Sequence, residues 1–401
     1  MKHLILSLAA LFLISGTTFA QDPAEKKEKE SGFQFTVVKE NPITPVKNQS
    51  SSGTCWSFSS LAFMESELLR LGKGEYDLSE MFVVSKTYTD KADRYVRLDG
   101  FLNFSQGGGF DDYLHVIKHY GMVPDQVMPG LNYGENEHRH GEMEAVLKGI
   151  VDAVKKNPNR KLSTAWRNAF QGALDAYLGA VPEKFTYNGT EYTPVSFAAS
   201  LGFNPEEYTG ITSYTHHPFY TQFALEIPDN WLWGTCNNLP LEDMMAVIDN
   251  AIMEGYTVLW ASDVSEQGFG RSGVAMFPTT NPEEMTGSDQ ARWLGMSPQE
   301  RANAFRNMNA PVAEVKEVTQ EMRQKDYDNK QTTDDHGMLI YGIAKDQNGN
   351  KYYMVKNSWG DTGPYKGLWY VSEKFVQYKT MDIQVNKNSI PKDIRKKMGI
   401  K

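Results

Sequence analysis

Residues 45–58 read PVKNQSSSGTCWSF, and this stretch decides the fold. A loop rich in Ser and Gly delivers Cys55 to the first turn of a helical pattern that runs to Leu71. Unpaired N–H groups and the helix dipole at that end favour the thiolate, which is the nucleophilic form. Gln49 comes a few residues earlier, so its amide NH₂ and the Cys55 backbone N–H can both donate to a developing oxyanion. The alternative is a small buried Cys at a helix start and an ordinary loop Gln.

Two later segments favour the catalytic interpretation. His336 opens a strand pattern, and a strand edge is a rigid place from which an imidazole can reach a sulfur. A protonated His336 beside Cys55 forms a thiolate–imidazolium pair that is nucleophilic at neutral pH. The Asn357 oxygen can accept from the far ring nitrogen of His336, and Trp359 can cover that hydrogen bond. Taken singly, His336 could be a core histidine and Asn357 a turn residue. It is hard to sustain such ordinary explanations for Cys55, His336 and Asn357 together, since the three occur in the correct chain order.

Helical and strand patterns are segregated along the chain. Helical spacing recurs over 55–71, 110–120, 142–156, 162–178 and 243–253, and helical signals continue in the polar stretch 285–325. Short β-rich runs follow at 256–261, 338–344, 351–356 and 367–371. Helices first and strands last predict an α+β protein with two segregated lobes.

Residues 49–58, 335–337 and 357–360 together resemble the three signatures of the papain-like cysteine peptidases. This resemblance implies a helical lobe that carries Cys55, a β-barrel-like lobe that carries His336 and Asn357, and an active site in the cleft between them. It also implies peptide substrates and an acyl-enzyme on Cys55, with no metal or organic cofactor. The residues that the resemblance assigns to substrate binding are Gly108, Gly109 and Trp359.

The chain departs from the commoner pattern of that family in informative ways. Ser52 replaces the usual cysteine three residues before the nucleophile, and Thr54 stands where Ser or Ala is usual. Cys55 and His336 are 281 positions apart, against about 130–150 in simple papain-like enzymes. These departures resemble the branch of bleomycin hydrolase and aminopeptidase C, as do the motifs YGMVP (120–124), HPFY (217–220) and ASDV (261–264). A helical insertion over about 134–235 is therefore expected on the first lobe.

The C-terminal tail, about 382–401, bears on specificity. Members of that branch are aminopeptidases because their C-terminal arm lies in the cleft, where its carboxylate binds the substrate amine. The resemblance thus implies that Lys401 carries this carboxylate, and it implies a hexameric homo-oligomer. A solvated tail is the alternative, and it would leave an open cleft and an endopeptidase. A catalytically silent papain-fold binding protein fits less well, because all four catalytic residue types are present.

The N-terminus predicts export. Lys2 is followed by an apolar stretch from Leu4 to Ile14 and by small residues at the cleavage positions, so residues 1–20 are expected to be a signal peptide. Residues 21–32 are charged and predict a disordered linker, and the peptidase domain then spans 33–401. The apolar stretch is too short to span a bilayer, so we expect no membrane segment and a periplasmic or secreted protein.

Composition sets further bounds. The net charge of −9 argues against nucleic acid as a partner. The two cysteines, Cys55 and Cys236, could pair in an exported protein, but a domain this large does not need the cross-link, so both are expected to be free. His138 and His140 lack the neighbouring ligands of a closed metal site and are expected to be exposed loop residues.

Overall fold

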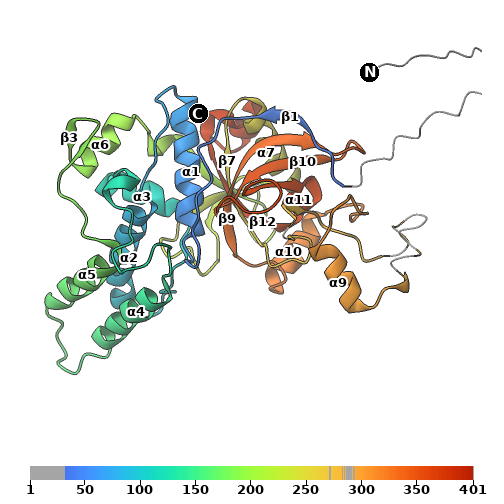
Figure 1. Cartoon of the computed structure of the whole chain (residues 1–401). Coiled ribbons are helices and arrows are strands. Elements are labelled where there is room, and N and C mark those ends of the chain that lie inside the picture. Colours follow the sequence, from blue (N-terminus) through green and yellow to red (C-terminus); the bar gives the residue numbers. More distant parts are fainter. Residues whose placement is uncertain are drawn as a thin grey trace, which may run out of the picture.

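The computed structural model describes residues 32–270, 272–281, 283, 285, 291 and 294–400. The expected signal peptide and all but the last residue of the expected linker lie outside these ranges. Figure 1 shows a helical lobe beside a lobe built around a sheet, with α1 at the junction. The prediction of an α+β fold with two lobes is confirmed.

The helical lobe is organised around α1 (Cys55–Arg70). This helix is buried on nearly every face because it packs against α2 and α3 on one side and against strands of the sheet on the other. The other helices of this lobe are α2 (Glu80–Arg97), α3 (Asp111–Tyr120), α4 (Gly141–Lys155), α5 (Ala165–Leu178) and α6 (Pro194–Leu201), with the 3₁₀ turns η1 (Asp125–Val127) and η2 (Pro205–Glu207) and the hairpin β2 (Phe185–Tyr187) and β3 (Thr190–Tyr192). Because α1 reaches both lobes, its first residue lies where they meet.

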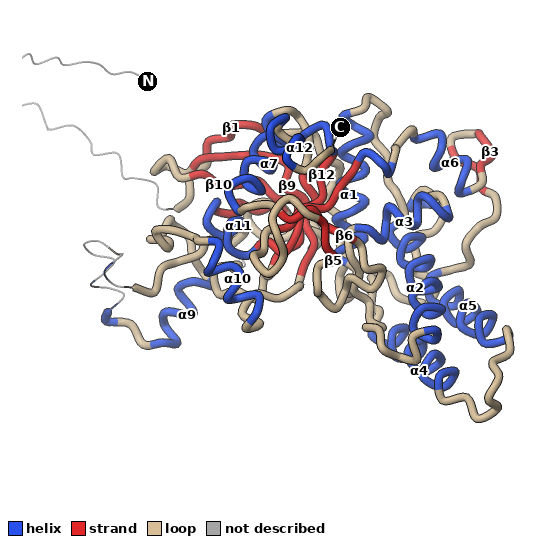
Figure 2. The backbone as a smooth tube through the Cα atoms, turned by 180° about the vertical axis from the view of Figure 1, so that it is seen from behind, coloured by secondary structure: helices blue, strands red, loops and turns tan. Residues whose placement is uncertain are grey.

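The second lobe contains a ten-stranded mixed sheet in the order β5-β6-β4-β12-β7-β9-β10-β11-β8, with β1 paired to β9. The strands are β1 (Thr36–Glu40), β4 (Tyr208–Thr212), β5 (Gln222–Ala224), β6 (Thr235–Asn238), β7 (Val258–Ser262), β8 (Val274–Ala275), β9 (His336–Lys345), β10 (Lys351–Lys356), β11 (Leu368–Ser372) and β12 (Thr380–Asn386). Figure 2 shows the strands at the centre of this lobe with helices around them. These helices are α7 (Leu241–Met253), α9 (Pro298–Arg306), α10 (Gln320–Asp328), α11 (Glu373–Lys379) and α12 (Lys392–Lys397), and η4 (Lys387–Ser389) precedes the last one.

Two expected boundaries differ from the structure. The stretch expected as a helical insertion, about 134–235, is helical only as far as Leu201, and from Tyr208 onward it forms β4, β5 and part of β6 in the main sheet. The first residues of the expected tail belong to β12, in which Ile383 pairs with β4 on one side and with β7 on the other. The tail that remains is therefore 387–401.

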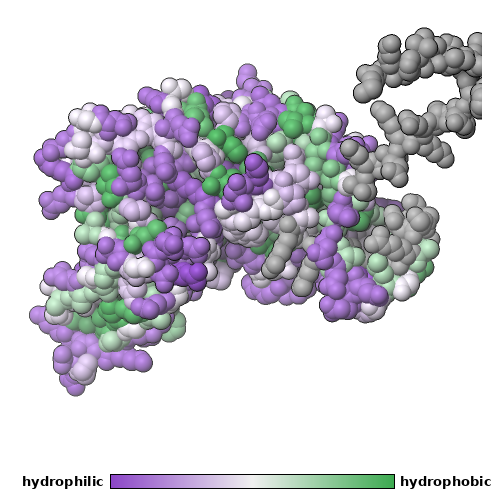
Figure 3. Space-filling view, in the orientation of Figure 1, coloured by the Kyte–Doolittle hydropathy of each residue, from purple (hydrophilic) through white to green (hydrophobic). Residues whose placement is uncertain are grey.

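Two large apolar clusters form the core. One apolar cluster joins α1 to α6, and a second fills the sheet lobe and includes α7, α11 and α12. On the face shown in Figure 3, hydrophilic residues predominate and apolar ones form small separate groups. Among the described helices none is long and apolar enough to cross a membrane.

Candidate active site

Cys55 is the first residue of α1, and its sulfur lies beside the start of β9. The backbone N–H groups of Gly337 and Trp56 face the Sγ atom and lower the pKa of the thiol, against the larger effect of burial. Gly337 directly follows His336, which is the first residue of β9. The helical lobe thus delivers the sulfur, and the sheet lobe delivers the imidazole, to the same pocket.

Asn357 fixes the orientation of His336. The His336 Nε2 and the Asn357 Oδ1 are 2.8 Å apart. The same Oδ1 accepts the Ser358 N–H at 2.7 Å, which identifies it as the oxygen of the amide. Nε2 therefore carries the proton and donates it, and Nδ1 remains as the base. Trp359 stacks on the imidazole, with ring centroids 4.9 Å apart and an interplanar angle of 28°.

Burial disfavours a charge on Cys55 alone or on His336 alone. It raises the pKa of Cys55 to about 12, and the nearby Asp334 and Asp229 add to this while the Gly337 N–H opposes it. Burial also lowers the pKa of His336 to about 4, opposed by the bond to Asn357. A proton that passes from the sulfur to Nδ1 creates both charges side by side, and their attraction is strong where water is excluded. The sulfur and the imidazole therefore ionise together, as a pair.

Gln49 is held rigidly by contacts to both lobes. Its N–H donates to the Ser358 carbonyl at 2.8 Å, and its Oε1 accepts the Ser358 hydroxyl at 2.5 Å. Its Nε2 donates one hydrogen to the Ser52 carbonyl at 2.8 Å, which leaves the second hydrogen for a ligand. The Ser52 hydroxyl contacts the Gln49 carbonyl and the Thr54 hydroxyl at 2.8 and 2.6 Å. Ser52 and Thr54, the two departures from the papain pattern, thus stabilise this loop by hydrogen bonds.

Gly108 and Gly109 line the same pocket as Cys55 and His336. The segment before them is tied to the catalytic loop, since the Gly53 N–H and the Trp56 Nε1 donate to the side chain and the carbonyl of Gln106 at 2.7 and 2.9 Å. A Cβ on Gly108 would stand 2.4 Å from the Asp112 Oδ2 and 2.8 Å from the Trp56 ring. Glycine at this position therefore permits a close approach that no other residue allows.

We expect Gly108→Ala to destabilise the protein by about 1–3 kcal/mol and to raise KM, because the anchored Trp56 ring cannot move away freely. The measurement is the thermal unfolding midpoint together with KM for a peptide reporter. Gly109→Ala is the matched control for stability, since its Cβ would meet nothing nearer than 3.8 Å. Equal unfolding midpoints for the two variants would contradict the crowding argument.

The described part of the C-terminal tail lies outside this pocket. Ile394 of α12 is buried in the core of the sheet lobe, and the Lys397 Nζ contacts the Asp243 Oδ2 at 3.2 Å. No residue from 387 to 400 lines the pocket. Lys401, the expected carrier of the amine-binding carboxylate, lies outside the described residues.

Cys236 also lines the pocket. Both cysteines are free, and the Cys236 sulfur lies 3.8 Å from the Asp382 Oδ2. Burial raises the pKa of this thiol well above its ordinary value. Cys236 is therefore a protonated thiol that donates to a carboxylate.

His138 and His140 are the two histidines expected as exposed loop residues. His140 is instead fully buried, and burial lowers the pKa of its imidazole to about 4, so the ring is neutral. Within the described residues, one group of three side chains could hold a metal: His216, His217 and Glu226 on an exposed turn. None of these residues lines the catalytic pocket.

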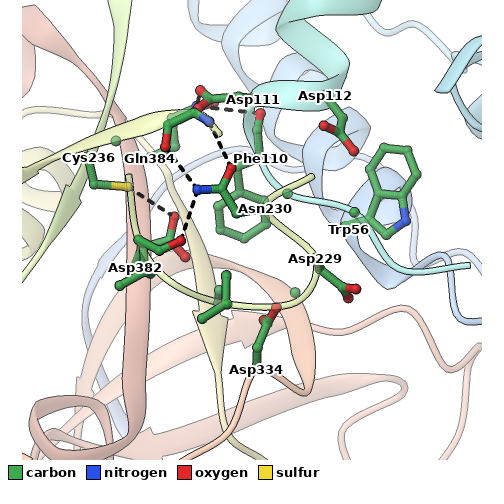
Figure 4. Close-up of a pocket in the computed structure, with 18 of the residues that line it drawn as sticks. Trp56, Phe110, Asp111, Asp112, Asp229, Asn230, Cys236, Asp334, Asp382 and Gln384 are labelled. Atoms are coloured by element: carbon green, nitrogen blue, oxygen red, sulfur yellow. Dashed lines mark hydrogen bonds between the residues drawn. The ribbon is translucent and has the colours of Figure 1, made fainter. Parts of the chain in front are cut away.

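Carboxylates are the pocket residues that the sequence did not reveal. Six aspartates line it: Asp111, Asp112, Asp229, Asp334, Asp335 and Asp382. Figure 4 shows five of them on different sides of the pocket, carried by α3, β12 and two loops. They come from four distant stretches of the chain, so no local motif indicates that they meet.

The geometry defines a class of enzyme. A sulfur at a helix N-terminus shares a pocket with an imidazole, and an amide holds that imidazole in one tautomer. A second amide, that of Gln49, is bonded to a carbonyl of the loop before the helix. Such a site performs nucleophilic acyl transfer through a thiol ester.

Comparison with known proteins identifies the family. The model of the "Papain family cysteine protease" matches residues 33–190, and that of the "Peptidase C1-like family" matches residues 308–400. The chain is 23% identical to aminopeptidase C of Lactobacillus delbrueckii subsp. lactis, over 98% of this chain and 90% of the relative. It is 22% identical to bleomycin hydrolase of Gallus gallus, over 90% and 84%. This chain therefore belongs to the papain-like cysteine peptidases, in the branch of bleomycin hydrolase and aminopeptidase C.

The fold agrees with a solved structure. The crystal structure of PepW from Lactobacillus rhamnosis HN001 matches with a TM-score of 0.68 and 19% identity, over 91% of this chain and 84% of that one. At this identity the likeness supports the fold alone.

Proposed function

We propose that this chain is a cysteine aminopeptidase of the bleomycin hydrolase type, which removes the first residue of peptide substrates. The observation that carries the proposal is the 2.8 Å contact of Asn357 with His336, which lines the same pocket as Cys55. Relatives named aminopeptidase C, aminopeptidase G and bleomycin hydrolase support the same activity.

The geometry supplies each step of hydrolysis. The Cys55 sulfur attacks the scissile carbonyl carbon while the His336 Nδ1 takes the thiol proton. The oxyanion accepts hydrogen bonds from the Cys55 N–H and from the free hydrogen of the Gln49 Nε2. His336 gives its proton to the leaving amine, which departs and leaves an acyl group on the sulfur. A water molecule, deprotonated by the same Nδ1, then attacks the acyl carbon and releases the first residue.

The test compares reporters that differ only at the amine. We expect hydrolysis of aminoacyl amides with a free amine, measured under reductant, and little or no hydrolysis of the same amides after N-acetylation. Hydrolysis of both with similar kcat/KM would contradict the aminopeptidase assignment and leave a cysteine peptidase of another specificity.

One observation favours a second candidate, an endopeptidase with an open cleft. Residues 387–400 pack on the sheet lobe and do not line the pocket, so the described tail does not block the path of a longer peptide. Internally quenched peptides with both ends blocked distinguish the candidates. Rapid cleavage of such peptides would support the endopeptidase, and a lack of cleavage would exclude it.

We propose in addition that the protein is exported, on the charged, apolar and small residues of positions 1–20. N-terminal sequencing of the protein from its native host is expected to begin at Gln21. A mature protein that retains Lys2 would contradict export by this signal.

A hexameric assembly is proposed on the resemblance to the branch alone. Light scattering of the purified protein is expected to give the mass of six chains. A monomeric mass across a wide concentration range would contradict the assembly and leave the catalytic proposal unchanged.

A further inference from the structure

The pocket around Cys55 and His336 is strongly acidic. A water-sized group can occupy about 50 Å³ of it, and six aspartates line it. No Lys or Arg is among its lining residues in the part of the chain that the structure describes. Lys91 lies behind the pocket and donates to the carbonyls of Ser105 and Gly107. The pocket therefore presents negative charge without a matching cation on its wall.

Three of the carboxylates have few hydrogen bonds. Asp111 receives the Gln384 Nε2 at 3.5 Å, and Asp382 receives the Cys236 thiol at 3.8 Å. Asp334 has no hydrogen-bond partner among the described residues. By contrast, Asp112 accepts the Trp231 Nε1 at 2.7 Å, and Asp229 accepts an amide hydrogen at 2.9 Å. Ionised carboxylates that are partly buried and unpaired carry a large desolvation penalty.

Gln384 provides an independent sign of a missing donor. This residue is only 1% exposed, and it lines the same pocket. Its Nε2 donates to the Phe110 carbonyl and to Asp111, both at 3.5 Å, but its Oε1 has no hydrogen-bond partner among the described residues. In Figure 4 it lies between Asp111 and Asp382. A buried carbonyl oxygen without a donor is uncommon and destabilising, so this oxygen requires a donor from the pocket.

The arrangement suits an organic cation better than a metal ion. No three of the pocket carboxylates place their oxygens within 4.8 Å of one another, because the one such group among the described residues contains His216, His217 and Glu226. An ammonium carries three N–H donors and no acceptor, which complements several spread acceptors. Burial raises the pKa of Asp111 to about 6 and, with repulsion from Asp111, that of Asp382 to about 7. A bound cation opposes both shifts.

We propose that Asp111, Asp334 and Asp382, together with the Gln384 Oε1, bind the cationic nitrogen of the substrate, beside the reactive sulfur. This proposal rests on the proposed function and names the group that selects its substrates. It assigns to the pocket wall the role that the family assigns to a terminal carboxylate. The described tail is held elsewhere, through Ile394 and the contact of Lys397 with Asp243.

Two cations share this chemistry: the α-ammonium of a first residue, and a Lys or Arg side chain on a blocked peptide. In an aminoacyl substrate only one carbon separates the amine from the scissile carbonyl, so the amine must bind in the same pocket as Cys55. We therefore assign the α-ammonium, and the experiment separates the two sources.

The experiment measures KM and kcat for three alanyl amides: the free amine, its N-acetyl form and the α-hydroxy analogue, which is neutral and similar in shape. Blocked dipeptide amides with lysine or norleucine in the second position from the scissile bond form the other arm. For Asp382→Asn and Asp111→Asn we expect KM for the free amine to rise by about 10-fold or more, since each change removes one charged partner. The ratio of KM for the α-hydroxy analogue to KM for the free amine should fall by the same factor.

Glu254→Gln is the matched control, because this exposed carboxylate at the end of α7 does not line the pocket. A second control appends two glycines to the C-terminus, which moves the terminal carboxylate without removing packed residues. The preference for a free amine should survive both changes. The contrary outcome is that the appended glycines abolish the preference for a free amine while Asp382→Asn and Asp111→Asn retain that preference. This outcome overturns the proposal and makes a terminal carboxylate the recognition group.

The pH dependence gives a readout that loss of folding would not imitate. The titratable groups facing the site are Cys55, Lys91, Asp111, Asp112, Asp229, Cys236, Asp334, Asp335, His336 and Asp382. As the pH falls from about 7 to about 5.5, the carboxyls become protonated while the α-ammonium, whose pKa is about 8, stays charged, so KM for the free amine should rise. KM for the hydroxy analogue should change little, and parallel changes for both would contradict the proposal.

The outcomes also separate this proposal from the proposed function. Loss of all hydrolysis in Cys55→Ala with an unchanged amine preference in both aspartate variants would retain the peptidase and reject the acidic site. A preference for lysine over norleucine in blocked dipeptides, lost in Asp382→Asn, would assign the site to a basic side chain and reject the α-ammonium.

Discussion

Replacement of Cys55 by alanine is expected to lower kcat/KM by about 10⁴-fold or more for every peptide substrate, since removal of a nucleophile in an acyl-transfer enzyme abolishes the covalent route. Its sulfur is the thiol next to β9, the strand that begins with His336. The variant should fold normally, because the side chain is small and the bonds that order loop 49–54 come from Gln49, Ser52 and Thr54.

Labelling with iodoacetamide provides the control for this prediction. The wild type and Cys236→Ala should each react rapidly at one thiol, and Cys55→Ala should not. The pocket contains a second thiol, so the comparison tests which of the two is activated. Peptide hydrolysis that persists in Cys55→Ala would remove this residue from its role, and with it the assignment of a thiol peptidase.

The second large effect is expected at Gln49. Gln49→Ala should lower kcat by about 10²–10³-fold, the usual result of removing one oxyanion donor. Alkylation of Cys55 by iodoacetamide should keep its rate, because that reaction forms no oxyanion. Steady-state kinetics and labelling rates together distinguish a donor from a residue that merely shapes the loop.

Ser358→Ala is the matched control for Gln49. It removes the hydroxyl that anchors the Gln49 Oε1 at 2.5 Å but leaves the donor in place, so its effect on kcat should be smaller by at least about 10-fold. If Gln49→Ala slows alkylation as much as it slows hydrolysis, the side chain acts on the position of the sulfur and not on the oxyanion.

The catalytic residues were accessible from sequence because each lies in a short, distinctive stretch. Cys55 follows a Ser- and Gly-rich loop at a helix start, and Gln49 belongs to the same stretch. His336 opens a strand, and Asn357 directly follows the next one. Their chemistry depends on residue type and local structure, so a single chain suffices to suggest them.

The acidic wall of the pocket was not accessible in this way. Asp111 begins a helix, where an acidic residue is ordinary because it complements the helix dipole. Asp382 lies on a strand and Asp334 in a loop, and neither has a neighbour in sequence that predicts its position. The packing of β12 between β4 and β7 places Asp382, and α3 and the loop before β9 bring Asp111 and Asp334 to the same pocket.

The late sheet strands were missed for a related reason. β4, β5 and β6 are three to five residues long, and β4, β5 and the first residue of β6 lie within the stretch 134–235 that the sequence predicts as a helical insertion. β12 carries the alternation Met381, Ile383, Val385, which is a strand signal, but it was assigned to the tail. Short strands bury too few residues for their periodicity to decide between strand and loop.

The position of β12 also has a consequence for biosynthesis. This strand is formed by residues 380–386 and lies between β4 and β7, so the sheet has a gap in its interior until nearly the whole chain has left the ribosome. Pairings between segments so distant in sequence form slowly. Asp382 and Gln384 enter the pocket with the same strand. A nascent chain therefore lacks both a closed sheet and a complete substrate pocket, and proteolytic activity is delayed until synthesis has finished.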